Sequence, residues 1–162
     1  MNEIDATEWG VWRKFYAMRR QLDRALEDQL QRDAQISGPD YEILLALFDA
    51  PERRLRSREL AEQTGWEKSR ISHQVTRMVS RGLVERSECP DDLRGTWISP
   101  TRDGLRAVLG AMREHSATIR RLFFDVLTDE ELATLGTASE RVLEAIDSTN
   151  SPSEGGELEA AG

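Results

Sequence analysis

The feature that most restricts the fold is a glycine between two short helical patterns, with two extended segments after them. Gly65 separates a predicted helix at 58–64 from a second one at about 67–81, and a left-handed glycine there would turn the chain. Residues 83–88 and 96–99 favour two strands. This order predicts two helices joined by a short turn and followed by a β-hairpin with a long, polar tip.

Long amphipathic helices are expected on both sides of this unit. Apolar residues recur about every 3.6 positions over 9–34, 101–127 and 129–147. A strongly apolar helix at 41–50, which Pro39 can open, is expected to be central to the core. The fold class is therefore mainly α with a small β-hairpin.

Local signals are expected to set several helix ends. Ser57 is a good N-cap for the short helix that follows it, and Thr101 is expected to cap the first long helix after the hairpin. Thr128 and Glu131 form a capping box for the last helix. Residues 53–56 are expected to form a short connector, which can include one extended segment.

Charge is distributed unevenly along the chain. The 22 basic and 30 acidic residues give a net charge of −8, which taken alone argues against nucleic-acid binding. Residues 52–113, however, hold 13 basic and 9 acidic residues, so the excess acid lies in the flanks. A basic middle predicts a surface that faces a polyanion, and the alternative is local pairing of these residues with acids.

Several classes of protein are not expected. The single cysteine, Cys89, allows no intramolecular disulfide, no apolar run approaches the ~20 residues of a membrane span, and the N-terminus lacks a secretory signal. These features favour the cytoplasm. We find no metal-ligand spacing, nucleophile–base pair or glycine-rich phosphate loop, so no metal, cofactor or enzymatic activity is expected.

The predicted helix at 67–81 has one apolar face and one polar, basic face. At about 100° per residue, one side forms an apolar stripe, and no acidic residue occurs from position 69 to 81. The residues of the stripe are Ile71, Val75, Met78 and Val79. The polar face suits base edges and phosphates in a DNA major groove, whereas a merely solvated face would mix both charges. The candidate DNA contacts are Ser69, Arg70, His73, Gln74 and Arg77.

The hairpin is expected to provide a second DNA contact. Arg94 lies beside Gly95 in the predicted tip, 89–95, so its side chain can project into a minor groove. Asp92 can pair with Arg94 and fix its direction, and the alternative is an ordinary surface ion pair. Over residues 40–99 the order of elements is that of a winged helix-turn-helix lobe.

The chain resembles the MarR family of bacterial transcriptional regulators over roughly residues 8–147. The resemblance is carried by LAEQTG…SRISHQVTRMVSRGLVER, then Asp92-x-Arg94 and Thr101-x-x-Gly104. It implies an obligate homodimer with interleaved first and last helices, each lobe reading half of a pseudo-palindromic operator. It further implies a repressor released by a small ligand, often aromatic or phenolic, held between the dimerisation region and the lobe.

The resemblance also assigns roles to single residues. The family's wing arginine corresponds to Arg94 and its companion aspartate to Asp92. Expected phosphate contacts near helix N-termini are Ser57, Arg58 and Lys68. Redox-sensing members carry a reactive cysteine near the first helix, which this chain lacks, and Cys89 is interpreted as a small filler or an exposed thiol.

Four segments are expected. They are a dimerisation helix (1–36), a winged helix-turn-helix lobe (37–100), C-terminal dimerisation helices (101–148) and a disordered acidic tail (149–162). The flanking helices carry more apolar surface than two or three helices can bury, and an intertwined second copy would cover it.

Aromatic and polar residues where the first helix meets the lobe are candidates for an effector pocket. These candidates are Trp12, Phe15, Tyr16, Arg19, Trp66 and His115. The alternative is that the aromatic residues belong to the core or the dimer interface and that His115 is a satisfied or exposed histidine. The predicted function is a homodimeric, sequence-specific regulator that binds double-stranded DNA. The alternative is a winged-helix protein–protein adaptor without DNA binding.

Overall fold

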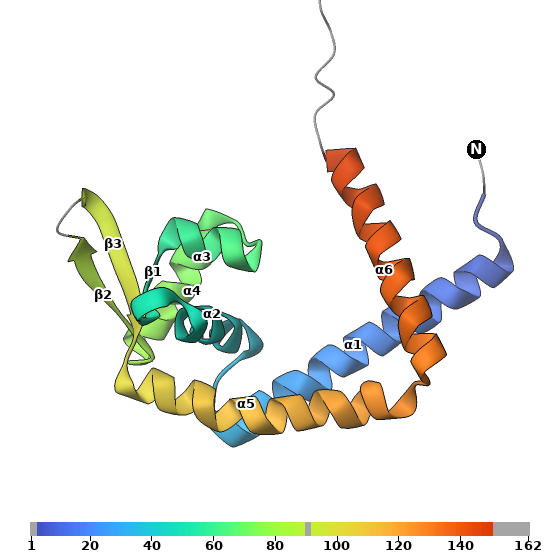
Figure 1. The fold of residues 1–162 in the computed structure, drawn as a ribbon, viewed down its shortest axis with the longest axis horizontal. Helices are drawn as coiled ribbons and strands as arrows, with labels where there is room; N and C mark the ends of the chain where they lie inside the picture. The colour runs from blue at the N-terminus through green and yellow to red at the C-terminus, as the bar shows by residue number, and fades with distance from the viewer. Residues whose placement is uncertain (1–2, 90–91, 151–162) are drawn as a thin grey trace, which may run out of the picture. The chain divides into compact units, whose positions relative to one another are not determined.

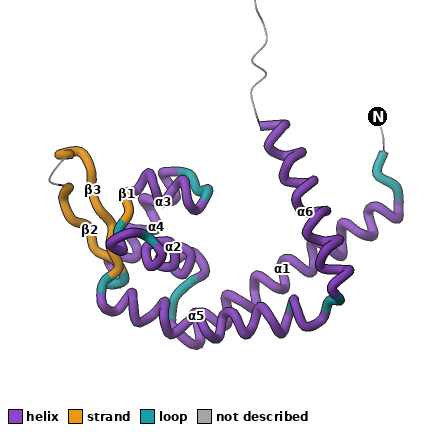
Figure 2. The backbone as a smooth tube through the Cα atoms, viewed as in Figure 1, coloured by secondary structure: helices purple, strands orange, loops and turns teal. Residues whose placement is uncertain are grey.

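The fold is mainly α-helical with one small antiparallel sheet, as the sequence predicted (Figures 1 and 2). The structure, a computed structural model, describes residues 3–89 and 92–150, and gives only the backbone for 89, 92–95 and 150. The elements are α1 (Ala6–Ala34), α2 (Gly38–Asp49), the 3₁₀ turn η1 (Pro51–Arg53), β1 (Leu55–Arg56), α3 (Ser57–Thr64), α4 (Lys68–Ser80), β2 (Val84–Cys89), β3 (Asp92–Pro100), α5 (Arg102–Leu122), the 3₁₀ turn η2 (Phe124–Val126) and α6 (Asp129–Asn150).

Contacts divide the chain into two compact units, residues 1–120 and 121–162. The first unit contains α1, the lobe from α2 to β3 and nearly all of α5, and the second contains α6. The lobe and the first helix thus share one unit. The assignment of dimerisation and DNA binding to separate segments stays a prediction.

The sheet has the strand order β1-β3-β2. The connector before α3 contributes the edge strand, with Leu55 opposite Ile98 and Arg56 opposite Trp97. The expected long tip is wrong, because β3 already begins at Asp92, opposite Cys89. A register shift at the end of β2 allows this pairing, so ladder hydrogen bonds outweigh the local turn preference of the tip residues.

The hydrophobic core lies in the lobe, and α2 is at its centre. Ile43, Leu44 and Leu47 of α2 are completely buried. The apolar stripe of α4 packs against the same core through Ile71, Val75 and Met78. Val79 was expected in this stripe but is 39% exposed, because it lies at the edge of the stripe, about 80° from Ile71.

The capping signals are partly confirmed. Thr101 Oγ1 accepts a hydrogen bond from Gly104 N (3.1 Å), and Thr128 and Glu131 form the capping box. Ser57, in contrast, is the first residue of α3, and Arg56 is its N-cap. The backbone N–H of Arg56 donates to Glu59 Oε2 (2.7 Å), so the cap forms one residue earlier than predicted.

Other helix ends also differ from the prediction, and α2 (Gly38–Asp49) begins three residues before 41. α1 begins at Ala6 rather than 9, because Asp5 caps it. α5 ends at Leu122 rather than 127, where a 3₁₀ turn follows. α6 continues to Asn150, beyond 147 and into the first residues of the predicted tail. The rest of that tail lies outside the described residues.

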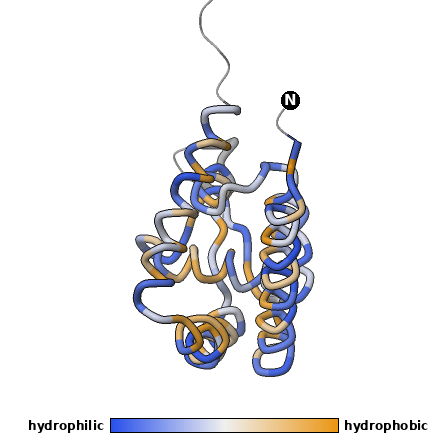
Figure 3. The backbone as a smooth tube through the Cα atoms, turned by 90° about the vertical axis from the view of Figure 1, so that its right-hand side faces the viewer, coloured by the Kyte–Doolittle hydropathy of each residue, from blue (hydrophilic) through white to orange (hydrophobic). Residues whose placement is uncertain are grey.

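Apolar and polar residues alternate along the turns of the long helices (Figure 3). On α6, Val142 and Leu143 are each 59% exposed and Ile146 is 49% exposed. Within the part of the chain that the structure describes, no helix has the length and apolar character needed to cross a membrane.

Candidate nucleic-acid interface

The exposed face of α4 is the centre of the candidate interface. Gly65, with a left-handed φ of 67°, turns the chain between α3 and α4, and Glu67 is the N-cap of α4. Burial of the apolar stripe fixes which side of the helix faces outward. The exposed residues on the opposite side include Ser69, His73 and Arg77. Since no acidic side chain occurs from 68 to 81, this face offers cations and hydrogen-bonding groups to a polyanion.

The other two predicted contacts of α4 interact with residues of the lobe itself. Gln74 is half-buried, and its amide donates a hydrogen bond to Asp40 Oδ1 (2.7 Å). Arg70 is exposed, and its guanidinium carbon lies 3.7 Å from the ring centroid of Trp66. Of the five candidates, three are therefore exposed on the outward face, and two, Arg70 and Gln74, contact other residues of the lobe.

A buried carboxylate connects α4 to the start of α2. Asp40 is completely buried, and its Oδ2 accepts hydrogen bonds from Arg81 and from the backbone N–H of Ser37 (2.9 Å). Arg81 also donates to the backbone oxygen of Gln35, the C-cap of α1 (2.6 Å). This network joins the end of α1, the start of α2 and both the middle and the end of α4.

The pKa of Asp40 reflects two opposing effects. Burial raises the pKa, but hydrogen bonds from Ser37 and Arg81, with the charge of Arg81, leave it below its ordinary value. Asp40 is therefore ionised at neutral pH. The network was not predicted from the sequence, although the spacing of Ser37 and Asp40 in SGPD is a capping-box signal.

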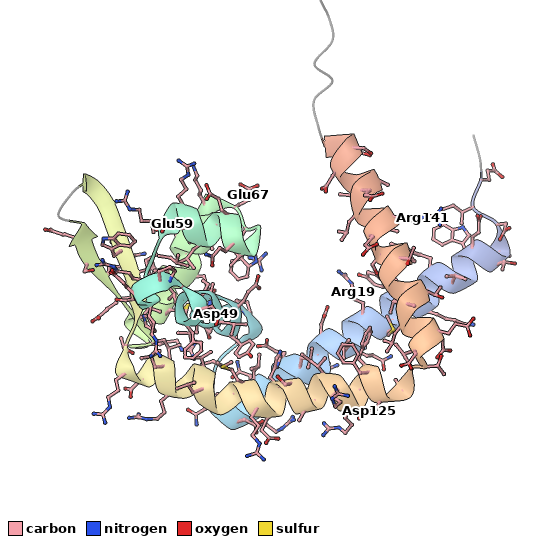
Figure 4. The ribbon with its side chains drawn as sticks, in the orientation of Figure 1. Arg19, Asp49, Glu59, Glu67, Asp125 and Arg141 are labelled. Atoms are coloured by element: carbon pink, nitrogen blue, oxygen red, sulfur yellow. The ribbon has the colours of Figure 1, made fainter. Side chains whose placement is uncertain are left out.

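The turn between α3 and α4 forms a hollow lined by cations and acids. Arg58, Lys68 and Ser69 line it, and so do Glu62 and Glu67. Arg58 Nε donates to Glu62 Oε1 (2.8 Å), so a phosphate group bound here would compete with Glu62 for Arg58. The first turn of α4 has no acidic residue, and the N-cap side chain makes no hydrogen bond to the backbone N–H groups at this positive end of the helix (Glu67 and, in α3, Glu59 are labelled in Figure 4). Ser57 is also exposed but does not line this hollow.

Further arginines lie on the sheet beside α3. The guanidinium carbons of Arg54 and Arg56 lie 4.6 Å and 5.1 Å from the ring centroid of Trp97. Arg54 also forms an ion pair with Glu52. These arginines were predicted only as part of a connector, although the RRLR run indicates a local concentration of positive charge. The side chains of Asp92 and Arg94, the predicted wing contacts, lie outside the described residues.

The structure of one chain does not bring the six effector candidates together. Trp12 lies near Phe15 and Tyr16 on an exposed part of α1, with centroids 6.0 Å and 6.4 Å apart, and Arg19 lies over Tyr16 (5.5 Å; labelled in Figure 4). Gln29, which contacts His115, lies 13 residues beyond Tyr16, about 20 Å along the same helix.

His115 has the environment of a satisfied histidine. Its Nδ1 lies 2.9 Å from Oε1 of the buried Gln29, and its ring lies 4.6 Å from that of Tyr41. Burial lowers the pKa of His115, so the imidazole is neutral at neutral pH. Among the described residues, no group of three or more His, Cys, Asp or Glu could hold a metal ion.

The chain is similar to known transcriptional regulators. The model of the MarR family matches residues 34–95. Sco3205 from Streptomyces coelicolor, a MarR family transcriptional regulator solved in complex with DNA, is 35% identical with a TM-score of 0.82, over 90% of this chain and 91% of that chain. AbsC, a MarR family transcriptional regulator from the same organism, is also 35% identical with a TM-score of 0.83, over 91% and 99%.

A more distant structure contains a small molecule. The PcaV transcriptional regulator from Streptomyces coelicolor, solved in complex with its natural ligand, is 26% identical with a TM-score of 0.68, over 90% of this chain and 99% of that chain. No curated protein matches the sequence.

Proposed function

Because the chain belongs to the MarR family of transcriptional regulators, we propose that it is a homodimer that binds a pseudo-palindromic site on double-stranded DNA. The exposed, acid-free face of α4 carries this proposal. Its outward residues suit direct contact with base edges in the major groove. These residues are Ser69, His73 and Arg77. The DNA complex of Sco3205 supports this mode of action.

Contacts to the DNA backbone are proposed around this face. Arg58 and Lys68 in the turn hollow, with Ser57 at the start of α3, would position the lobe on phosphates. Arg94 would enter the minor groove with Asp92 as its partner. We assign Gln74 to holding α4 in place rather than to base contact, because its amide is bound to Asp40.

Replacing Arg77 by alanine should weaken binding to DNA. The loss is expected to be about 1–3 kcal/mol, or about 5- to 150-fold in Kd, because an exposed cation is removed from the recognition face. Binding can be measured by fluorescence anisotropy, using a duplex selected by the wild-type chain from a random 30-bp library.

The control for this variant is Arg106→Ala, which removes an exposed arginine of α5 that pairs with Asp103. It should leave the affinity almost unchanged. Equal losses in both variants would contradict the assignment of Arg77. A protein adaptor without DNA binding would select no sequence at all, so the selection itself distinguishes the two functions.

The homodimer is proposed from apolar surface that one chain leaves uncovered. On α6 this surface includes Val142, Leu143 and Ile146, and on α1 it includes Trp9 and Trp12. A second copy of the chain would cover these residues and fix the spacing of two α4 helices. Two such helices about one DNA turn apart can enter successive major grooves.

Replacing Val142 and Ile146 together by glutamate should shift the dimer toward monomer, because two charges would enter an apolar interface. Sedimentation at several protein concentrations would measure this shift. Glu144→Lys, on the opposite side of α6, is the control and should leave the dimer intact. A dimer unchanged by the double replacement would exclude α6 from the interface.

We further propose that a small molecule releases the protein from DNA, so that it acts as a repressor in the cytoplasm, where bacterial DNA lies. The structure of PcaV with its natural ligand supports an effector. Within one chain, the exposed group of Trp12, Phe15, Tyr16 and Arg19 is the best remaining candidate.

A further inference from the structure

The guanidinium group of Arg70, in the first turn of α4, lies over the indole ring of Trp66. Its guanidinium carbon lies 3.7 Å from the centroid of the Trp66 ring, the shortest such contact among the described residues. Trp66 belongs to the turn between α3 and α4 and packs against the hydrophobic core. A planar guanidinium above an indole is a favourable cation–π arrangement. The ring therefore restricts the directions that Arg70 can take.

The Trp66 ring is itself held in place by packing. It is partly buried and lies against the hydrophobic core of the lobe. The exposed carboxylate of Glu42, in α2, attracts the nearby Arg70 electrostatically. Trp66 and Arg70 thus form one group, and Trp66 cannot easily rotate away because its ring has a packing surface.

In the proposed complex with DNA, this group would lie at the N-terminal end of α4, which is the end of a recognition helix that contacts the bases. Arg70 is in the first turn of α4, and the first residues of such a helix contact base edges in the major groove. Arginine binds O6 and N7 of guanine with two hydrogen bonds, which requires one orientation of the guanidinium plane. An arginine that is already ordered in the free protein loses less entropy when it binds.

We propose that Trp66 is a positioning residue that orients Arg70 to read one guanine in each half-site. This inference rests on the proposed DNA binding and deepens it, because it names the residues that set the preference at one base pair. It also gives Trp66 a role in reading DNA in place of its expected role in an effector pocket.

The test compares sequence preferences rather than affinity alone. Wild type, Arg70→Ala, Trp66→Leu and the double variant would each select duplexes from the same random 30-bp library. We expect Arg70→Ala and Trp66→Leu to lose preference for guanine at the same base pair, by about 5- to 150-fold. The double variant should lose no more of the guanine preference than either single variant, because both substitutions remove the same contact between Arg70 and the base.

Two further variants separate positioning from general stability. Trp66→Phe keeps an aromatic face and should retain most of the guanine preference. Phe48→Leu removes another aromatic ring that lies under an arginine, Arg53, but at the end of α2, and should leave all base preferences unchanged. If Trp66→Leu fails to fold, Trp66→Met provides the test, because methionine fills irregular apolar space without an aromatic face, and a loss at the same base pair is expected.

Each outcome has a distinct meaning. Trp66→Leu with an intact guanine preference, at a base pair where Arg70→Ala loses it, would overturn the inference. So would a uniform loss of affinity for all sequences, which is the result of a merely structural role. A wild-type chain that selects no sequence would instead overturn the proposed function.

Discussion

Replacing Asp40 by alanine is expected to lower the free energy of unfolding by about 2–4 kcal/mol. Breaking a fully buried ion pair costs about 3–5 kcal/mol. We expect somewhat less here, because the Arg81 side chain is 40% exposed and water can partly solvate its unpaired charge. The change also removes the acceptor of the Gln74 amide, which is half-buried.

The matched control is Asp103→Ala, which breaks an ion pair that water already surrounds. The Asp103 and Arg106 side chains are 71% and 68% exposed, so the loss should be at most about 1 kcal/mol. Both variants should be melted at one protein concentration, since a dimer's stability depends on concentration. Equal losses would show that the Asp40 network does not hold the lobe together.

The pH dependence of stability gives a second readout for Asp40. Because the pKa of this carboxyl is lower in the folded protein, its contribution is fully present above the unfolded pKa of about 3.9. That contribution is lost as the pH falls through the lowered folded value. Asp40→Asn should therefore be less stable than wild type at pH 7, with a smaller difference at pH 3. A constant difference would mean that the charge of Asp40 is irrelevant.

The sequence predicted the fold well because the fold depends on local patterns. Apolar periodicity located the helices, and Gly65 located the turn, since each signal spans only a few residues. Their ends were less predictable. A ladder pairing or a cap formed one residue earlier, as at Arg56, depends on partners that a local pattern does not contain.

The sequence predicted which face of α4 is exposed, but it did not predict which residues of that face bind other parts of the lobe. Helical geometry correctly placed Ile71, Val75 and Met78 inward and the polar residues outward. It could not show that Gln74 and Arg81 bind a carboxylate 34 and 41 positions away. Such long-range pairs arise from tertiary packing. They separate the residues of α4 that hold the lobe together from those that are available to DNA, although the sequence shows one uniform polar face.

The second large effect is expected at Gly104, in the first turns of α5. A Cβ atom built there would lie 2.0 Å from the backbone oxygen of Leu83 and 3.1 Å from Cδ2 of Leu44. The first contact is with backbone, which cannot rotate away, so α5 would have to move away from the turn between α4 and β2, where Leu83 lies. Gly104→Ala should lower the free energy of unfolding by about 3 kcal/mol or more, which is the upper end of the range typical of overpacking.

Gly110→Ala, in the same helix, isolates this contact from the intrinsic preference of alanine for helices. An added Cβ at Gly110 meets nothing within 4 Å, so this variant should be more stable by about 1 kcal/mol. Alanine at 104 has the same intrinsic advantage, and any difference between the two melting curves therefore measures the approach of α5 to Leu83. If Gly104→Ala were as stable as Gly110→Ala, α5 would not lie against that carbonyl. If it unfolded early but still bound DNA at low temperature, the close approach would support the lobe without shaping its recognition face.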